Sequence, residues 1–180
     1  MSESLIWRIR NRDQQAMREL YQEYVEMLSS VCYRYVVEES DVKDVLQDSF
    51  VKILSSVGSF EYRDEISFRG WMKRIVANAA LHFLKEKKRL QFTELNEGCV
   101  QQISDEEPNV ELVSADELHR LVSELPDGYR TVVNLYVFEG YSHRKIAEML
   151  SIKESTSASQ FYHAKQLLAK RIKDLIDKKS

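Results

Sequence analysis

The sequence contains few of the residues that interrupt or cross-link a chain, with five glycines, two prolines and two cysteines among 180 residues. Scarce glycine and proline disfavour the many turns of a β-rich domain. Few segments show the strict apolar and polar alternation of strands, whereas apolar residues recur at three- and four-residue steps along much of the chain. The sequence therefore predicts an all-α protein.

The two cysteines, Cys32 and Cys99, lie far apart and belong to no paired motif. This excludes a disulfide framework or a metal-ligand spacing and fits a reducing compartment. The longest apolar run, residues 75–84, is interrupted by polar residues and is too short to span a bilayer, and residues 1–12 lack the apolar core of a signal peptide. We expect a cytoplasmic protein.

Catalytic patterns are also lacking. The sequence contains no Ser-His-Asp set, glycine-rich phosphate loop or paired metal ligands, and its four histidines are scattered. We expect these histidines to be surface or core residues, and we expect no cofactor, metal, small-molecule substrate or enzymatic activity. The histidines are His82, His119, His143 and His163.

The net charge of −3 is small but unevenly distributed. Residues 1–90 carry 15 basic and 14 acidic side chains, residues 91–125 carry one and nine, and residues 126–180 carry ten and six. Residues 91–111 also lack a sustained apolar period. This pattern predicts two small helical domains, residues 1–90 and 114–180, joined by a flexible acidic linker, residues 91–113.

Apolar periodicity predicts the helices of both domains. In the first domain, Ser40 is suited to cap a helix that ends near Gly58, and Trp71 shares an apolar stripe with Ile75, so we assign it to the core. In the second domain, we expect residues 126–128 to turn the chain. The predicted helices cover residues 5–37 (as one helix or two), 40–57, 68–89, 114–125 and 129–138.

Residues 140–165 carry two short helical patterns separated by one tight turn. Ser142 is suited to cap the first helix, Ser151 breaks its pattern, and Ser155 or Thr156 is suited to cap the second, which we expect to continue to about Ile176. Two helices joined by about three or four residues cross steeply, as in a helix-turn-helix. Such a unit directs the start of its second helix toward a DNA major groove. Any helical hairpin shows similar stripes, so this segment alone leaves DNA binding open.

The order of these segments resembles bacterial sigma factors of the extracytoplasmic-function (ECF) group, the short form with regions two and four only. DVKDVLQDSFVKIL, residues 41–54, resembles the part that docks on the clamp helices of RNA polymerase. Residues 67–89 resemble the segment that opens and reads the minus-ten promoter element. Residues 121–152 resemble the opening of region four, and ESTSASQFYHAKQLL, residues 154–168, resembles its recognition helix in a helix-turn-helix (winged-helix-like) domain.

The resemblance implies three contact sites, each with a chemical rationale. Docking on a basic clamp needs exposed acceptors beside an apolar anchor, for which the candidates are Asp41, Asp44, Gln47, Asp48 and Phe50. Strand opening needs a pocket for a flipped base and polar groups for the backbone. The candidates for this site are Phe60, Tyr62, Phe68, Arg69, Arg74, Asn78, Lys85 and Lys88. The minus-thirty-five candidates are Arg144, Ser155, Thr156, Ser157, Ser159, Gln160, His163 and Lys165.

The recognition helix departs from the family pattern. Ser157 stands where an apolar residue is usual, Ala158 and Gln160 stand where lysine and arginine are common, and Ser151 replaces the common turn glycine. The helix is therefore poor in cations, which indicates that it positions a polymerase that is already held elsewhere.

The resemblance predicts a transcription initiation factor whose partners are core RNA polymerase, promoter DNA and an anti-sigma factor. It also implies that the linker threads toward the RNA exit path, with Asp105, Glu106 and Glu107 as mimics of nucleic-acid charge, although a soluble tether explains the linker equally well. Two other functions stay open on the residues. One is a stand-alone helix-turn-helix regulator whose first half senses a signal or dimerises, and the other is a helical scaffold that binds only protein.

Overall fold

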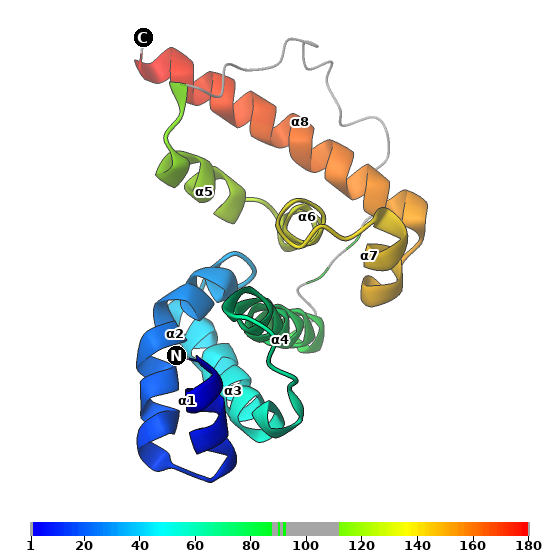
Figure 1. The fold of residues 1–180 in the computed structure, drawn as a ribbon. Coiled ribbons are helices and arrows are strands. Elements are labelled where there is room, and N and C mark those ends of the chain that lie inside the picture. The colour runs from blue at the N-terminus through cyan, green and yellow to red at the C-terminus, as the bar shows by residue number, and fades with distance from the viewer. Residues whose placement is uncertain (1, 88–89, 91, 93–111, 180) are drawn as a thin grey trace. The chain divides into compact units, whose positions relative to one another are not determined.

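The computed structural model describes residues 2–87, 90, 92 and 112–179, and all regular elements in these residues are helical. The chain separates into two units, Met1–Lys87 and Lys88–Ser180 (Figure 1). The all-α prediction is confirmed. Lys88, Cys99 and the linker carboxylates at residues 105–107 lie outside the described residues.

The first unit contains four helices and one helical turn, which run α1 (Ser2–Arg10), α2 (Gln14–Tyr33), α3 (Glu39–Ser56), η1 (Val57–Ser59) and α4 (Glu65–Glu86). The segment predicted over residues 5–37 is two helices. The two helices are separated at Arg12, whose φ of 60° lies in the left-handed region. Asp13 then caps α2, because its side chain accepts hydrogen bonds from the amides of Gln15 and Ala16.

Helices α2, α3 and α4 pack against one another around a core that includes the fully buried Leu20, Leu28 and Ile53. The thiol of Cys32 is also buried in this core, and burial raises its pKa to about 12. None of the helices in the described residues is long and apolar enough to cross a membrane.

Two predictions about this unit are wrong in detail. Ser40 does not cap α3, because the helix already begins at Glu39, and Glu38 occupies the cap position without a side-chain hydrogen bond. The buried face of α4 passes through Met72 and Val76, while Trp71 is only half-buried. The core face is therefore turned by one residue, about 100° around the helix axis, from the predicted stripe.

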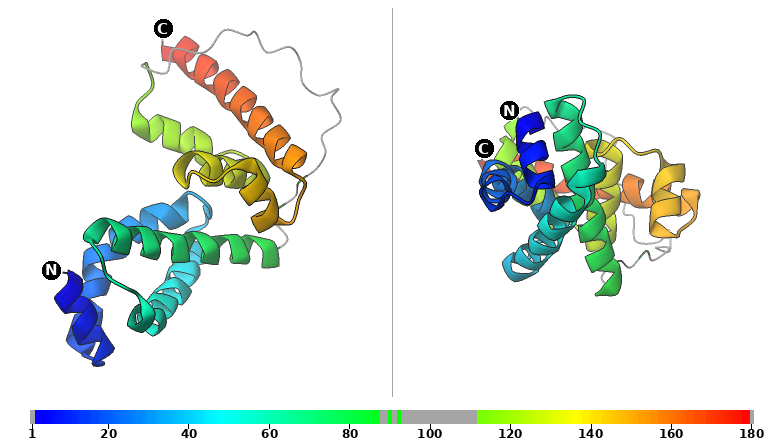
Figure 2. Two further views of the ribbon diagram at one scale, coloured as in Figure 1. Left: turned by 45° about the vertical axis from the view of Figure 1, so that its right-hand side comes forward. Right: turned by 60° about the horizontal axis from the view of Figure 1, so that its bottom comes forward.

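The second unit contains α5 (Ala115–Ser123), α6 (Asp127–Val133), the π-helical turn η4 (Asn134–Phe138), α7 (His143–Leu150) and α8 (Glu154–Lys179). The long helix α8 contacts α5, α6 and α7, and Figure 2 shows it running past all three. The core of the second unit includes Leu125, Val133 and Ala164. Asp127 and Gly128 lie inside the first turn of α6, so the predicted turn at residues 126–128 ends two residues earlier than expected, at Pro126.

The helix-turn-helix prediction is confirmed in its geometry. Ser142 caps α7 by accepting a hydrogen bond from the amide of Lys145, and Ser151 ends α7 in the left-handed conformation with φ 59° and ψ 44°. Glycine adopts this conformation without strain, whereas serine does so at a cost. Helix α8 begins at Glu154, so Ser155 and Thr156 lie inside its first turn instead of capping it, and it continues three residues past the predicted end at Ile176.

Candidate functional site

The predicted docking residues lie on α3, and most of them share one exposed face. Asp44, Gln47 and Asp48 are exposed and Asp41 is half-buried. At about 100° per residue, these four side chains fall within an arc of about 120° on the helix. The opposite face of α3 packs into the core.

Phe50 does not belong to this face, which corrects its assignment as the apolar anchor beside these acceptors. Its side chain is only 6% exposed, and its ring packs against Tyr21 of α2 with the ring centroids 4.7 Å apart. The exposed apolar residue among the α3 carboxylates is Val51, which is 64% exposed. Its spacing from Asp44 and Asp48 could have revealed it, because residues seven and three positions apart share a helix face.

The loop after α3, residues 57–64, carries Phe60 and Tyr62 toward the start of α4. Phe60 lies 4.8 Å from Trp71 and 5.4 Å from Phe68 between ring centroids, and Tyr62 lies 6.3 Å from Phe68. Phe60, Tyr62 and Trp71 are each half-buried. These three rings therefore have exposed area beside the 57–64 loop on which a nucleic-acid base could stack.

Phe68 lies beneath these rings and does not reach the surface. Its side chain is fully buried, in edge contact with Tyr24 at 5.8 Å and stacked on Trp71 at 5.8 Å. Phe68 therefore supports the exposed aromatics instead of contacting a base, which corrects its assignment. Trp71, assigned to the core, shares the half-exposed position of Phe60.

The polar residues predicted to hold the DNA backbone divide between two faces of α4. Arg74, Asn78 and Lys85 are exposed, and their spacing of four and seven residues places them on one face. Arg69 lies on another face, where its Nε donates to Glu65 at 2.7 Å and its guanidinium lies 5.8 Å from the centre of the Tyr24 ring. The same carboxylate oxygen of Glu65 accepts the hydroxyl of Tyr24 at 2.8 Å.

The first turns of α8 present a narrow polar face. Ser155, Ser159 and Lys165 are exposed, while Thr156 and His163 are half-buried. Tyr162, which the sequence reasoning missed, lies between Ser159 and Lys165 and is 58% exposed. The amide of Gln166 donates to its hydroxyl at 2.9 Å. The spacing of three residues between Ser159 and Tyr162 was the available signal.

Two residues assigned to the groove are buried instead. Ser157 is 0% exposed and Gln160 is 3% exposed, because both face the interior of the second unit. The hydroxyl of Ser157 lies 3.0 Å from Nδ1 of His143 on α7, which supplies the polar partner that a buried hydroxyl needs. Ser157 thus occupies an interior position with a polar side chain, and neither residue is available for base contact.

The cations near this face are partly engaged with acidic neighbours. Nε of Arg144 lies 3.8 Å from Glu148, and Nζ of Lys145 lies 3.1 Å from the same carboxylate. Exposed pairs of this kind are weak, so either side chain can turn toward a phosphate at little cost. Arg144 of α7 and Ser155, Ser159 and Lys165 in the first half of α8 are therefore the exposed candidate DNA contacts of the second unit.

Comparison with known families assigns both units. Residues 20–90 match Sigma-70 region 2, and residues 115–168 match Sigma-70, region 4. The ECF RNA polymerase sigma-E factor of Haemophilus influenzae is 29% identical over 186 residues, covering 97% of this chain and 96% of the relative. The ECF RNA polymerase sigma factor SigW of Bacillus subtilis is 25% identical over 186 residues, covering 97% and 98%.

One solved structure has a similar fold. The sigma factor RpoE, crystallised with the anti-sigma factor NepR from Bartonella quintana, aligns with a TM-score of 0.50 at 17% identity. The alignment covers 87% of this chain and 98% of that chain. At this level of identity the likeness concerns the fold alone.

Proposed function

The chain belongs to the sigma-70 family of RNA polymerase sigma factors, in the ECF group, and from this premise we propose how its two units divide the work of promoter-directed transcription initiation. The first unit docks on core RNA polymerase and opens the minus-ten element, and the second unit binds the minus-thirty-five element. The observation that carries the proposal is the placement of an acidic helix face and an aromatic loop in the unit that precedes the helix-turn-helix.

The docking surface is the exposed face of α3. Asp41, Asp44, Gln47 and Asp48 supply acceptors for a basic partner, and Val51 supplies apolar contact area among them. Charge complementarity speeds encounter with a partner, while burial of an apolar side chain slows dissociation. Phe50, which packs against Tyr21 of α2, lies outside this surface.

The minus-ten site combines the 57–64 loop with one face of α4. A flipped base stacks against the exposed parts of Phe60, Tyr62 and Trp71, while Arg74, Asn78 and Lys85 contact the strand backbone. Stacking on aromatic rings contributes about 1–3 kcal/mol per base, which offsets the few kcal/mol lost when a base leaves the duplex.

The minus-thirty-five site is the exposed face at the start of α8. Ser155, Ser159 and Tyr162 face the groove, with Arg144 and Lys165 toward phosphates. Few cations lie on this face, so the second unit contributes modest affinity and its DNA contact depends on polymerase held by the first unit.

Several further properties follow from this role. The protein has no enzymatic activity of its own and works in the cytoplasm, where the polymerase is found. An anti-sigma factor controls its access to polymerase, as the co-crystallised partner of the similar RpoE structure suggests.

Run-off transcription with core polymerase tests the proposal. We expect the protein to direct initiation from a small set of fragments in a genomic promoter library, with no initiation by core polymerase alone. Failure to initiate from any fragment would contradict the proposal. Tight, specific binding of the purified chain to duplex DNA at physiological salt would instead indicate a stand-alone regulator.

A further inference from the structure

We propose that α1 positions the 57–64 loop for minus-ten recognition and that Arg10 is the positioning residue. The inference rests on the proposed role of this loop in reading the minus-ten strand. Helix α1 lies before residue 20, where the match to Sigma-70 region 2 begins.

The contact joins residues that are far apart in the sequence. Nη2 of Arg10 donates a hydrogen bond of 2.7 Å to the backbone carbonyl of Phe60, and α1 also packs against η1, residues Val57–Ser59. Because the acceptor is a main-chain oxygen, the bond constrains the path of the loop whatever the orientation of the Phe60 ring. A charge-assisted hydrogen bond of this length is stronger than one between neutral groups.

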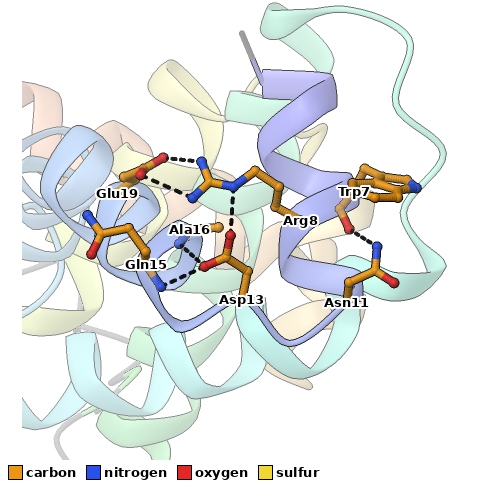
Figure 3. Close-up of polar contacts among 7 residues, drawn as sticks. All are labelled: Trp7, Arg8, Asn11, Asp13, Gln15, Ala16 and Glu19. Atoms are coloured by element: carbon orange, nitrogen blue, oxygen red, sulfur yellow. Dashed lines mark hydrogen bonds and ion pairs between the residues drawn. The ribbon is translucent and has the colours of Figure 1, made fainter.

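Helix α1 is itself firmly held, so Arg10 projects from a fixed base. Leu5, Ile6 and Ile9 are buried in the first unit. On the side toward α2, the guanidinium of Arg8 bridges two carboxylates, as Figure 3 shows. Its Nε lies 2.7 Å from Asp13 and its Nη1 lies 2.7 Å from Glu19.

Asp13 links this bridge to the start of α2. One of its carboxylate oxygens accepts the amides of Gln15 and Ala16, and the other accepts from Arg8. The hydrogen bond from Arg8 is the main reason that the pKa of Asp13 is lowered. A rotation of α1 would break these contacts, so its orientation relative to α2 is well defined.

Phe60 is thus held at two points. Its ring packs against Phe68 and Trp71 of α4, and its carbonyl is bound by Arg10 of α1. Loss of Arg10 removes only the second restraint. The packing among Phe60, Phe68 and Trp71 is retained, so the first unit stays folded while the loop backbone gains freedom next to the proposed base-binding rings.

The test uses holoenzyme, assembled from core polymerase and the full chain, and fork-junction DNA whose minus-ten single strand is a randomised pool. Wild-type holoenzyme should enrich particular bases at the minus-ten positions. Arg10→Ala should reduce affinity about three- to tenfold, the net value of one solvent-exposed hydrogen bond, and should flatten the base preference at one or two adjacent positions only. The melting temperature of the Arg10→Ala chain should match that of the wild-type chain.

Two variants separate positioning from charge. Arg10→Lys keeps the charge and a donor and should restore part of the lost base preference. Arg18→Ala removes the same charge from an exposed site on α2 and should leave the preference unchanged. An equal loss of affinity for every sequence in the pool, or unfolding of Arg10→Ala, would overturn the inference.

The same experiment distinguishes this inference from the proposed function. If wild-type holoenzyme enriched no bases, the minus-ten role of the first unit would fail, and the role of α1 with it. If wild-type holoenzyme enriched bases and Arg10→Ala enriched them identically with equal affinity, only the role of α1 would fail.

Discussion

Nδ1 of His143 lies 3.0 Å from the hydroxyl oxygen of Ser157, and this hydrogen bond joins the two helices of the helix-turn-helix. The imidazole is also stacked on Tyr136, with ring centroids 4.5 Å apart and an interplanar angle of 12°. Because Ser157 is buried, its hydroxyl cannot exchange this partner for solvent.

Ser157→Ala should therefore lower the free energy of unfolding of the second unit by about 1 kcal/mol, the typical net contribution of one hydrogen bond. Urea unfolding followed by circular dichroism measures the change. Ser155→Ala removes an exposed hydroxyl two residues away and should change stability by less than about 0.5 kcal/mol. Equal effects of the two substitutions would show that the His143 contact contributes nothing.

Among the aromatic residues beside the 57–64 loop, Phe68 supports the fold from the interior, whereas Tyr62 is a proposed DNA contact. Phe68→Ala should destabilise the first unit by about 3–5 kcal/mol, because it leaves a cavity beneath the exposed rings. Tyr62→Ala should cost much less stability but should reduce promoter opening. Thermal unfolding and permanganate footprinting of unpaired thymines measure the two effects, and a Tyr62→Ala variant with normal opening would remove Tyr62 from the proposed site.

The acidic face of α3 provides a test of polymerase docking. Asp48→Arg reverses a charge on this face, so we expect about tenfold weaker association with core polymerase, chiefly through a slower association rate. Surface plasmon resonance at several salt concentrations measures both rates. Glu26→Arg makes the same charge change on an exposed position of α2 and serves as the control. A similar loss for both variants would indicate a general charge effect instead of a docking face.

The recognition helix is poor in cations, and its affinity for DNA should respond to an added one. Ala158 is exposed in the first turns of α8, so Ala158→Lys should strengthen holoenzyme binding to minus-thirty-five duplex. One new phosphate contact should steepen the dependence of log affinity on log salt by about one. Asp177→Asn adds the same net charge at the far end of α8 and should leave the slope unchanged.

The stability of the second unit should depend on the protonation of Glu117 at low pH. Hydrogen bonds from Lys179, and then from the amide and hydroxyl of Ser114, lower the pKa of Glu117 from an ordinary 4.5 to about 2. A carboxylate whose pKa falls on folding stabilises the native state above its ordinary pKa, and this contribution disappears as the pH falls toward the lowered value.

Removal of the lysine should reduce this loss of stability in acid. Lys179→Ala leaves only the Ser114 contacts, so the pKa of Glu117 is lowered less; the second unit should be less stable than the wild type at neutral pH and should lose less stability between about pH 5 and pH 2. Circular dichroism during thermal unfolding at each pH provides the measurement. Lys178→Ala, one residue away, should follow the wild-type curve.

Features that depend on a few neighbouring residues could be predicted from the sequence. The Ser142 cap, the Ser151 turn and the helix-turn-helix follow from local hydrogen bonding and apolar spacing, and all are present. The rotation of each helix depends on its packing partners, and an error of one residue turns a side chain by about 100°. Phe68, Ser157 and Gln160 were therefore assigned to the surface although tertiary contacts bury them.

Long-range contacts left no signal in the sequence. The hydrogen bond between Arg10 and Phe60 joins positions 50 residues apart, and no periodicity connects them. The same holds for Tyr21 and Phe50, whose contact keeps the expected docking anchor out of the exposed face of α3.

The buried thiol of Cys32 has a consequence for oxidative conditions. Oxidants attack the thiolate, and burial raises the pKa of Cys32 to about 12, so almost none of the thiol is ionised at neutral pH. Cys32 therefore behaves as a small apolar side chain that peroxide does not modify while the first unit stays folded. The first unit should therefore show no oxidation at Cys32 after peroxide treatment.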